Sequence, residues 1–117
     1  MSVKGIMKYL STVLLLAPLA SAAHAGCPES MNRDPTFIAL AVDAGAPRPA
    51  SAEDFRFVGD TTTFAELTAK VGPPDAAKGT SSFLYCLADG TVITVSSRDG
   101  TEIRFVRVNG KTLYKRK

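Results

Sequence analysis

Two cysteines, Cys27 and Cys86, are the residues of this chain whose chemistry is easiest to anticipate. In an oxidising compartment an even number of cysteines usually forms disulfides. A bond between these two would tie the N-terminal tail to the strand-rich second half of the chain. Closing a loop of this length stabilises a fold by about 4 kcal/mol in the chain-entropy treatment. We predict a Cys27–Cys86 disulfide.

The chain offers little else for acid–base or metal chemistry. Its one histidine, His24, lies near the N-terminus, and there is no Cys-x-x-Cys, P-loop or GxGxxG motif. The carboxylates are typical of structural positions: Glu53 and Asp54 at a helix start, Asp89 and Asp99 in turns. We therefore predict no catalytic residues, no metal site and no cofactor. A small carboxylate-dependent hydrolase acting on the cell wall is the enzymatic alternative.

The N-terminal segment has the pattern of an export signal. Lys4 and Lys8 form a basic region, Leu10–Leu19 is apolar, and Ala23-His24-Ala25 fits a cleavage site. We predict a cleaved signal peptide over residues 1–25 and a single domain over 26–117. Loss of the two lysines lowers the net charge from +3 to about +1, which argues against nucleic-acid binding.

Cys27 has a competing role as a lipid anchor. Ala25-Gly26-Cys27 resembles the end of a lipobox, in which the cysteine is lipidated and becomes the first residue. His24 stands where a large aliphatic residue is usual, and lipidation would leave Cys86 as a spare thiol. The disulfide is our prediction and the lipid anchor stays open as the alternative.

The last third of the chain predicts a β-meander. Asp89-Gly90, Asp99-Gly100 and Asn109-Gly110 are dipeptides of two-residue hairpin turns, and they separate runs of β-branched and aromatic residues. The expected strands are Ser82–Ala88, Thr91–Ser97, Glu102–Val108 and Lys111–Lys115.

The middle of the chain predicts short helices. Thr63 and Glu66 form a capping box for a helix that ends at Gly72. Ser51 and Asp54 form a second box, so Ala52–Val58 is a helix or, because Phe55 and Phe57 alternate with polar residues, a strand. Three further segments complete the expectation: an irregular Gly26–Arg33, a short helix or buried strand over Phe37–Val42, and a flexible link over Ala76–Ser81. The predicted fold class is α+β, with one or two short helices packed on a three- to four-stranded antiparallel β-meander.

Two-residue turns would sort the meander into an aliphatic and an aromatic face. The aliphatic face would pack under the helix that begins after Thr63. The aromatic face predicts a partner-binding surface, unless Phe37–Val42 or the segment with Phe55 and Phe57 folds over it, or a bulge at Asp99-Gly100 flips the third strand. Its predicted binding residues are Phe83, Tyr85, Phe105 and Tyr114.

Positive charge gathers at the C-terminal end. These residues discourage pairing at a sheet edge, or they form a site for an anionic partner such as a lipid head group or an acidic protein surface. They are Arg98, Arg104, Arg107, Lys111, Lys115, Arg116 and Lys117.

The stretch Val58–Leu67 with Val71-Gly72-Pro73-Pro74-Asp75, followed by Phe83-x-Tyr85 and the Asp-Gly turns, resembles two groups. These are the SmpA/OmlA (BamE-like) small outer-membrane lipoproteins and the β-lactamase-inhibitor-protein-like repeat. The resemblance implies two helices on a three- or four-stranded antiparallel sheet, and members that bind other proteins without catalysis.

We therefore expect an exported periplasmic protein-binding module whose partner is another envelope or secreted protein. The alternative is an outer-membrane-anchored lipoprotein that assists envelope or outer-membrane protein assembly. A membrane contact is expected only if Cys27 is lipidated.

Overall fold

The computed structural model describes residues 27–117. The predicted signal peptide and its cleavage site lie outside the described residues, as do Gly26 and His24. The described elements are α3 (Cys27–Arg33), β1 (Ile38–Ala39), a 3-10 helix η1 (Ala52–Phe55), α4 (Phe64–Val71), β2 (Ala76–Lys78), β3 (Ser82–Cys86), β4 (Val92–Arg98), β5 (Glu102–Val108) and β6 (Lys111–Lys115).

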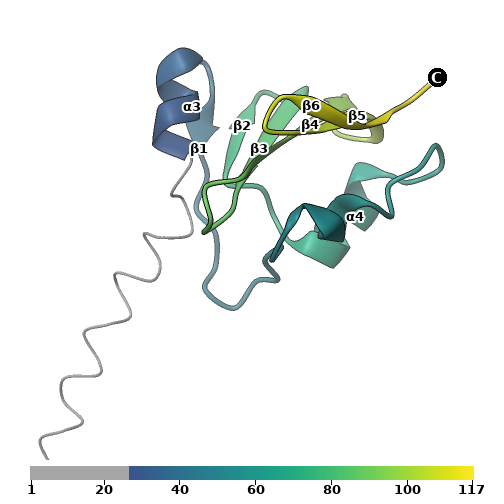
Figure 1. Cartoon of the computed structure of the whole chain (residues 1–117), viewed down its shortest axis with the longest axis horizontal. Helices are drawn as coiled ribbons and strands as arrows, with labels where there is room; N and C mark the ends of the chain where they lie inside the picture. Colours follow the sequence, from purple (N-terminus) through teal and green to yellow (C-terminus); the bar gives the residue numbers. More distant parts are fainter. Residues whose placement is uncertain (1–26) are drawn as a thin grey trace, which may run out of the picture.

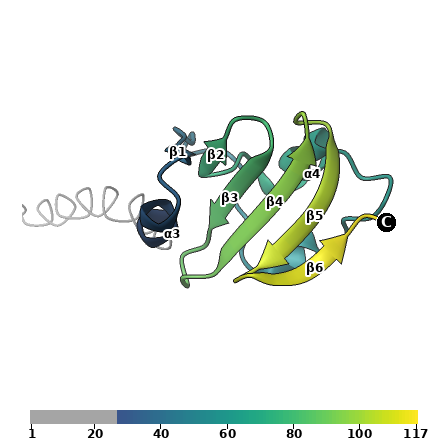
Figure 2. The same cartoon turned by 90° about the horizontal axis from the view of Figure 1, so that it is seen from above.

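The strands form one antiparallel sheet in the order β1-β2-β3-β4-β5-β6 (Figure 2). The predicted α+β class is confirmed, but the prediction of three to four strands is wrong because the sheet has six. The two additional strands are β1, in a segment for which a short helix or a buried strand was predicted, and β2, in a segment that was predicted to be a flexible link. Ala76–Lys78 is rich in alanine and has no apolar–polar alternation, so only its pairing with β3 makes it a strand.

In Figure 1, α4 lies below the sheet, and η1 packs into the same core. The helix α3 lies beside the β1 end of the sheet and packs on its other face. Both predicted capping boxes are present. Thr63 and Glu66 cap α4, and Ser51 and Asp54 cap η1. The second helix is shorter than predicted: η1 ends at Phe55 after a single turn, whereas a helix over Ala52–Val58 was one of the two predictions.

The segment before β1 is helical, whereas an irregular chain was expected. Seven residues are too few for a helix to be stable in water by itself. Here α3 is held at one end by the disulfide of Cys27, and its Met31 packs against the small core that contains Leu84 and Cys86. Tertiary attachment therefore stabilises a helix that local propensity does not predict.

The register of the first hairpin differs from the predicted one. The structure pairs Cys86 with Val92, whereas a two-residue loop at Asp89-Gly90 would place Cys86 opposite Ile93. Because a shift of one residue turns every side chain of a strand to the other face, Tyr85 now lies opposite Ile93. The predicted separation into an aliphatic and an aromatic face is therefore wrong.

Two register shifts further along the sheet also change which side chains share a face. One between Ser96 and Ser97 brings Ile103 opposite Ser97, and one after Val106 brings Tyr114 opposite Val106. Each shift is a bulge that moves one large side chain to the helix-covered face. Of the three predicted two-residue turns, the last has that form, since the strand pairing resumes directly on either side of Asn109-Gly110.

We call the helix-covered side of the sheet the inner face and the opposite side the outer face. The inner face and the helical layer enclose the main core: Phe55, Val58, Leu67, Val71, Phe83, Tyr85, Leu87, Ile93, Val95, Ile103 and Val106. A smaller core under α3 covers one end of the outer face and contains Cys27, Ala76, Leu84 and Cys86.

Candidate functional site

The disulfide between Cys27 and Cys86 is present, with the two Cα atoms 5.6 Å apart. The prediction of this bond is confirmed, and the bond is consistent with an oxidising, extracytoplasmic compartment. The two sulfur atoms and a carboxylate oxygen of Asp75 lie within 4.8 Å of one another. A metal would require free thiolates, and the disulfide occupies both sulfurs.

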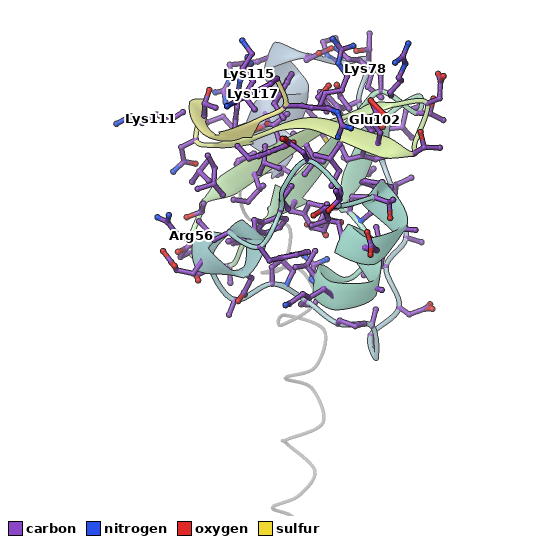
Figure 3. The ribbon with its side chains drawn as sticks, turned by 90° about the vertical axis from the view of Figure 1, so that its right-hand side faces the viewer. Arg56, Lys78, Glu102, Lys111, Lys115 and Lys117 are labelled. Carbon is purple, nitrogen blue, oxygen red and sulfur yellow. A yellow bond between two sulfur atoms is a disulfide. The ribbon has the colours of Figure 1, made fainter. Side chains whose placement is uncertain are left out.

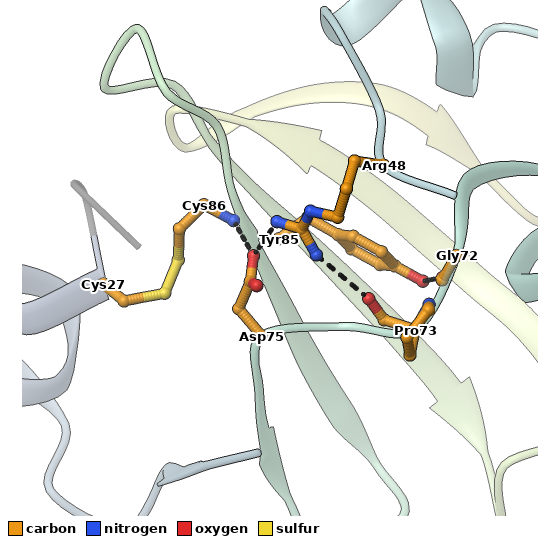
Figure 4. Close-up of polar contacts among 7 residues, drawn as sticks. All are labelled: Cys27, Arg48, Gly72, Pro73, Asp75, Tyr85 and Cys86. Carbon is orange, nitrogen blue, oxygen red and sulfur yellow. Dashed lines mark hydrogen bonds and ion pairs between the residues drawn. A yellow bond between two sulfur atoms is a disulfide. The ribbon is translucent and has the colours of Figure 1, made fainter. Parts of the chain in front are cut away.

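A polar network surrounds this disulfide (Figure 4). Asp75 is fully buried; its carboxylate accepts the Cys86 N–H at 2.7 Å and a guanidinium N–H of Arg48 at 2.8 Å. Arg48 also donates to the Pro73 carbonyl at 3.4 Å. The loop that carries Arg48 is thereby fastened to the start of β2, and the role of Asp75 is structural.

Replacing Arg48 by methionine is expected to lower the free energy of unfolding by about 2 kcal/mol. Removing one partner of a buried ion pair costs about 3–5 kcal/mol. The cost here is smaller because 27% of the Arg48 side chain is exposed, so water can reach the vacated position. Urea denaturation of Arg48→Met measures the loss, and Arg56→Met, whose exposed ion pair with Glu53 contributes little, is the control. Equal stability of the two variants would contradict this role of Arg48.

Phe83 and Tyr85, two of the four predicted partner-binding residues, lie in the main core. Tyr85 is fully buried, packs edge-on against Phe55 with ring centroids 5.1 Å apart, and donates its hydroxyl to the Gly72 carbonyl at 2.8 Å. Burial raises the pKa of Tyr85 far above its usual value. Phe83 stacks on Phe64 at 4.2 Å. Their predicted exposure is wrong, because the register of the first hairpin turns both rings under the helices.

Tyr114 also belongs to the inner face, at its margin. Its hydroxyl donates to an Asp60 carboxylate oxygen at 2.6 Å, and Arg116 donates to the Asp60 carbonyl at 2.6 Å. Burial and the Asp60 contact raise the pKa of the Tyr114 hydroxyl. These bonds hold the C-terminus against the turn before α4, so Tyr114 is half-buried rather than part of an open surface.

Phe105 alone of the four lies on the outer face, as the cross-strand partner of Ser96 and Lys115. It is half-buried, and the guanidinium of Arg107 lies 4.2 Å from its ring centroid. The predicted aromatic surface is thus reduced to one ring beneath a cation.

The outer face around Phe105 is open and cationic. It holds a depression of about 440 Å³ lined by Arg98, Glu102, Arg104, Phe105, Lys115, Arg116 and Lys117. Figure 3 shows Lys115 and Lys117 on the side of the sheet away from the helical layer, which carries Arg56. Five cations of this face are exposed, and we call them the cationic face: Arg98, Arg104, Arg107, Lys115 and Lys117.

The opposite end of the outer face has a different character. A second depression of about 440 Å³ lies beside α3 and includes Glu29, Asp34 and Arg33 together with apolar Phe37 and Leu84. Within the cationic depression the one carboxylate is Glu102, which pairs with Arg116 at 3.5 Å. Positive charge is therefore concentrated on one end of the outer face.

The sequence identified seven basic residues near the C-terminal end but not that five of them share the outer face. Arg107 and Lys115 occupy opposite sides of a register shift between β5 and β6, so the shift decides which face each one reaches. A bulge within two runs of charged residues leaves no signal in hydrophobic alternation. The cationic face was therefore visible only as a composition bias.

No protein family, curated protein or solved structure matches this chain. The resemblance to the small outer-membrane lipoproteins therefore remains a hypothesis. Within residues 27–117 no helix combines the length and apolar character that crossing a bilayer requires.

Proposed function

We propose that this chain is an exported, non-catalytic binding module of the periplasm that binds an acidic surface of another envelope or secreted protein. The observation that carries the proposal is the cationic face, an open area of sheet with five exposed cations around Phe105. Its inner counterpart is filled by α4 and η1 and offers no comparable surface. Complementary charge favours association with an acidic partner and fixes its orientation.

A sheet surface of this kind suits a protein partner. The guanidinium of Arg107 lies over the Phe105 ring, so that a partner would meet the exposed Arg107 and the part of the ring that it leaves open. Aromatic and arginine side chains are the residue types most often dominant in protein interfaces. A central ring with a charged rim therefore gives both affinity and specificity.

The periplasmic form is preferred over the lipid-anchored one for a chemical reason. Lipidation of Cys27 would use the same sulfur atom that forms the disulfide with Cys86. The alternative, an anchored lipoprotein that assists outer-membrane assembly, requires that disulfide to be absent. Intact-mass measurement of the exported protein distinguishes the two.

Charge reversal on the cationic face is expected to weaken partner binding. The wild-type exported protein is immobilised, and a partner is captured from periplasmic extract and purified. The affinity of this partner is then measured for the wild type and for the double variant Arg104→Glu/Lys115→Glu. We expect at least tenfold weaker binding and a smaller salt dependence, because exposed interface charges act mainly through long-range attraction. Lys70→Glu, on α4 at the other side of the molecule, is the matched control and should bind like the wild type.

Two outcomes would overturn the proposal. One is a captured protein whose affinity is unchanged by the double reversal. The other is binding of the exported protein to vesicles containing phosphatidylglycerol, with no protein captured, because that would make the cationic face a membrane-surface site.

A further inference from the structure

The two depressions of the outer face adjoin each other on the sheet. One is the cationic depression around Phe105, and the other lies beside α3 over Leu84, Val92 and Thr94. Thr94 is the cross-strand partner of Arg107, whose guanidinium lies 4.2 Å from the Phe105 ring centroid. The Thr94–Arg107 pair therefore joins the two depressions into one open groove across β3, β4, β5 and β6, which we call the outer groove (Figure 2).

The two ends of the outer groove differ in charge. Within the described residues, none of the five cations of the cationic face forms an ion pair, and the one carboxylate among them, Glu102, is already paired. At the α3 end, Glu29 pairs with Arg33 at 3.3 Å and Asp34 pairs with Lys78 at 2.8 Å, so the charges there are balanced. A molecule that fills the whole groove must therefore be negative at one end and carry little net charge at the other.

The α3 end of the outer groove has an apolar floor with a polar rim. Leu84 is buried in the small core under α3, and Phe37 and Val92 are half-buried against that core. Polar side chains that can bond a peptide backbone surround this floor: Ser30, Thr94 and Asn109. An apolar side chain on a peptide backbone suits such a site, whereas a hydrocarbon tail would cover the polar groups without bonding them.

The distance between the two ends follows from strand geometry. Neighbouring strands lie about 4.8 Å apart, so the floor on β3 and β4 is about 10 Å from the cations of β5 and β6. Thr94 stands two residues before Ser96, the cross-strand partner of Phe105, which adds about 7 Å along the strand. The resulting diagonal of about 12 Å is the length of about four residues of extended chain.

We propose that the outer groove binds an extended peptide segment of the partner, with acidic residues at one end and a large apolar residue about four positions away. The carboxylates meet the cationic face, and the apolar side chain lies over Leu84, between α3 and the Asn109-Gly110 turn. The segment lies across the face of the sheet and does not pair with an edge strand. This inference rests on the proposed function, because it specifies which part of the acidic partner is bound.

Selection from a phage library of random dodecapeptides on the exported, oxidised protein tests the proposal. We expect enriched sequences with at least two Asp or Glu residues and a large apolar residue about three to five positions from them. An enriched peptide is then synthesised with a fluorescent label, and its affinity is measured by fluorescence anisotropy. The double variant Arg104→Glu/Lys115→Glu should bind it at least tenfold more weakly than the wild type, because the reversed charges repel its carboxylates.

Thr94→Lys distinguishes the proposed peptide from a ligand that is held by charge alone. An added cation strengthens a purely electrostatic complex, but at residue 94 it meets the apolar side chain, so at least fivefold weaker binding is expected. Thr112→Lys is the matched control, since it makes the same change on the other side of Arg107 and outside both depressions. It should not weaken binding. Ser30→Lys, on α3, is a second variant at the apolar end that leaves the sheet unchanged, and circular dichroism checks that every variant is folded.

Three outcomes would overturn the inference. They are the absence of an enriched peptide, an enriched peptide whose affinity the charge reversal leaves unchanged, and binding that Thr94→Lys and Ser30→Lys leave unchanged or strengthen. The third outcome leaves the proposed function in place, because an acidic ligand is still bound at the cationic face. The proposed function fails separately, when the affinity of the captured protein partner is unchanged by the charge reversal.

Discussion

Replacing Tyr85 by alanine is expected to lower the free energy of unfolding by about 4 kcal/mol. Truncating a fully buried aromatic ring costs about 3–5 kcal/mol, because the surrounding side chains cannot fill the cavity. Tyr85 also loses its edge contact with Phe55, and the Gly72 carbonyl loses its donor at a buried helix end. Urea denaturation followed by circular dichroism measures the change at constant m-value.

Two further variants distinguish the contribution of the buried Tyr85 ring to stability from that of its hydroxyl and from that of a ring on the outer face. Tyr85→Phe keeps the ring and removes only the hydrogen bond to Gly72, so a loss of about 1 kcal/mol is expected. Phe105→Ala removes the half-buried outer-face ring and should cost clearly less stability than Tyr85→Ala while weakening partner capture. A Tyr85→Ala protein with wild-type stability would mean that this ring is not in the core.

Removal of the disulfide is expected to cost about 4 kcal/mol as well. The bond joins residues separated by 59 positions, and the chain-entropy relation gives this magnitude for such a loop. The double variant Cys27→Ala/Cys86→Ala should show the loss in urea denaturation, and α3 should become the first site of proteolysis. A seven-residue helix has little stability once its attachment to β3 is gone.

Chemical reduction is the control that leaves the sequence unchanged. The native protein should have no titratable thiol, and reduction under mild denaturation should yield two titratable thiols. The reduced protein should lose as much free energy of unfolding as the double variant does. Two free thiols in natively purified protein would contradict the disulfide. An intact mass with a diacylglycerol-modified Cys27 would favour the lipid-anchored alternative.

The local elements of this fold are determined by short-range chemistry. Thr63 and Glu66 begin α4, and Gly72 ends it, because capping bonds and a positive φ of 91° depend on residues close in sequence. The Asn-Gly hairpin and the strands of the meander follow from turn residues and β-branched runs in the same way. Even the disulfide was foreseeable, since two cysteines in a chain that is predicted to be exported allow one intramolecular pairing.

The faces of the sheet depended on the tertiary structure. A single extra residue in the Asp89-Gly90 loop reverses which face Tyr85 occupies, and bulges do the same for Ile103 and Tyr114. No local pattern distinguishes these registers, because both strand faces carry apolar residues. Packing under α4 and η1 selects one of them, and that selection decides which residues remain for a partner.

The segments without local signals were also decided by tertiary contacts. Ala76–Lys78 and Ile38–Ala39 are strands only because β3 offers a free edge to the first and β2 to the second. The helix α3 is held by its disulfide to Cys86. The buried Asp75 is tolerated because Arg48, 27 residues earlier in the chain, donates a hydrogen bond to its carboxylate. Sequence therefore determined elements whose stabilising partners are neighbours in the chain, whereas the three-dimensional packing determined the register and the open cationic face.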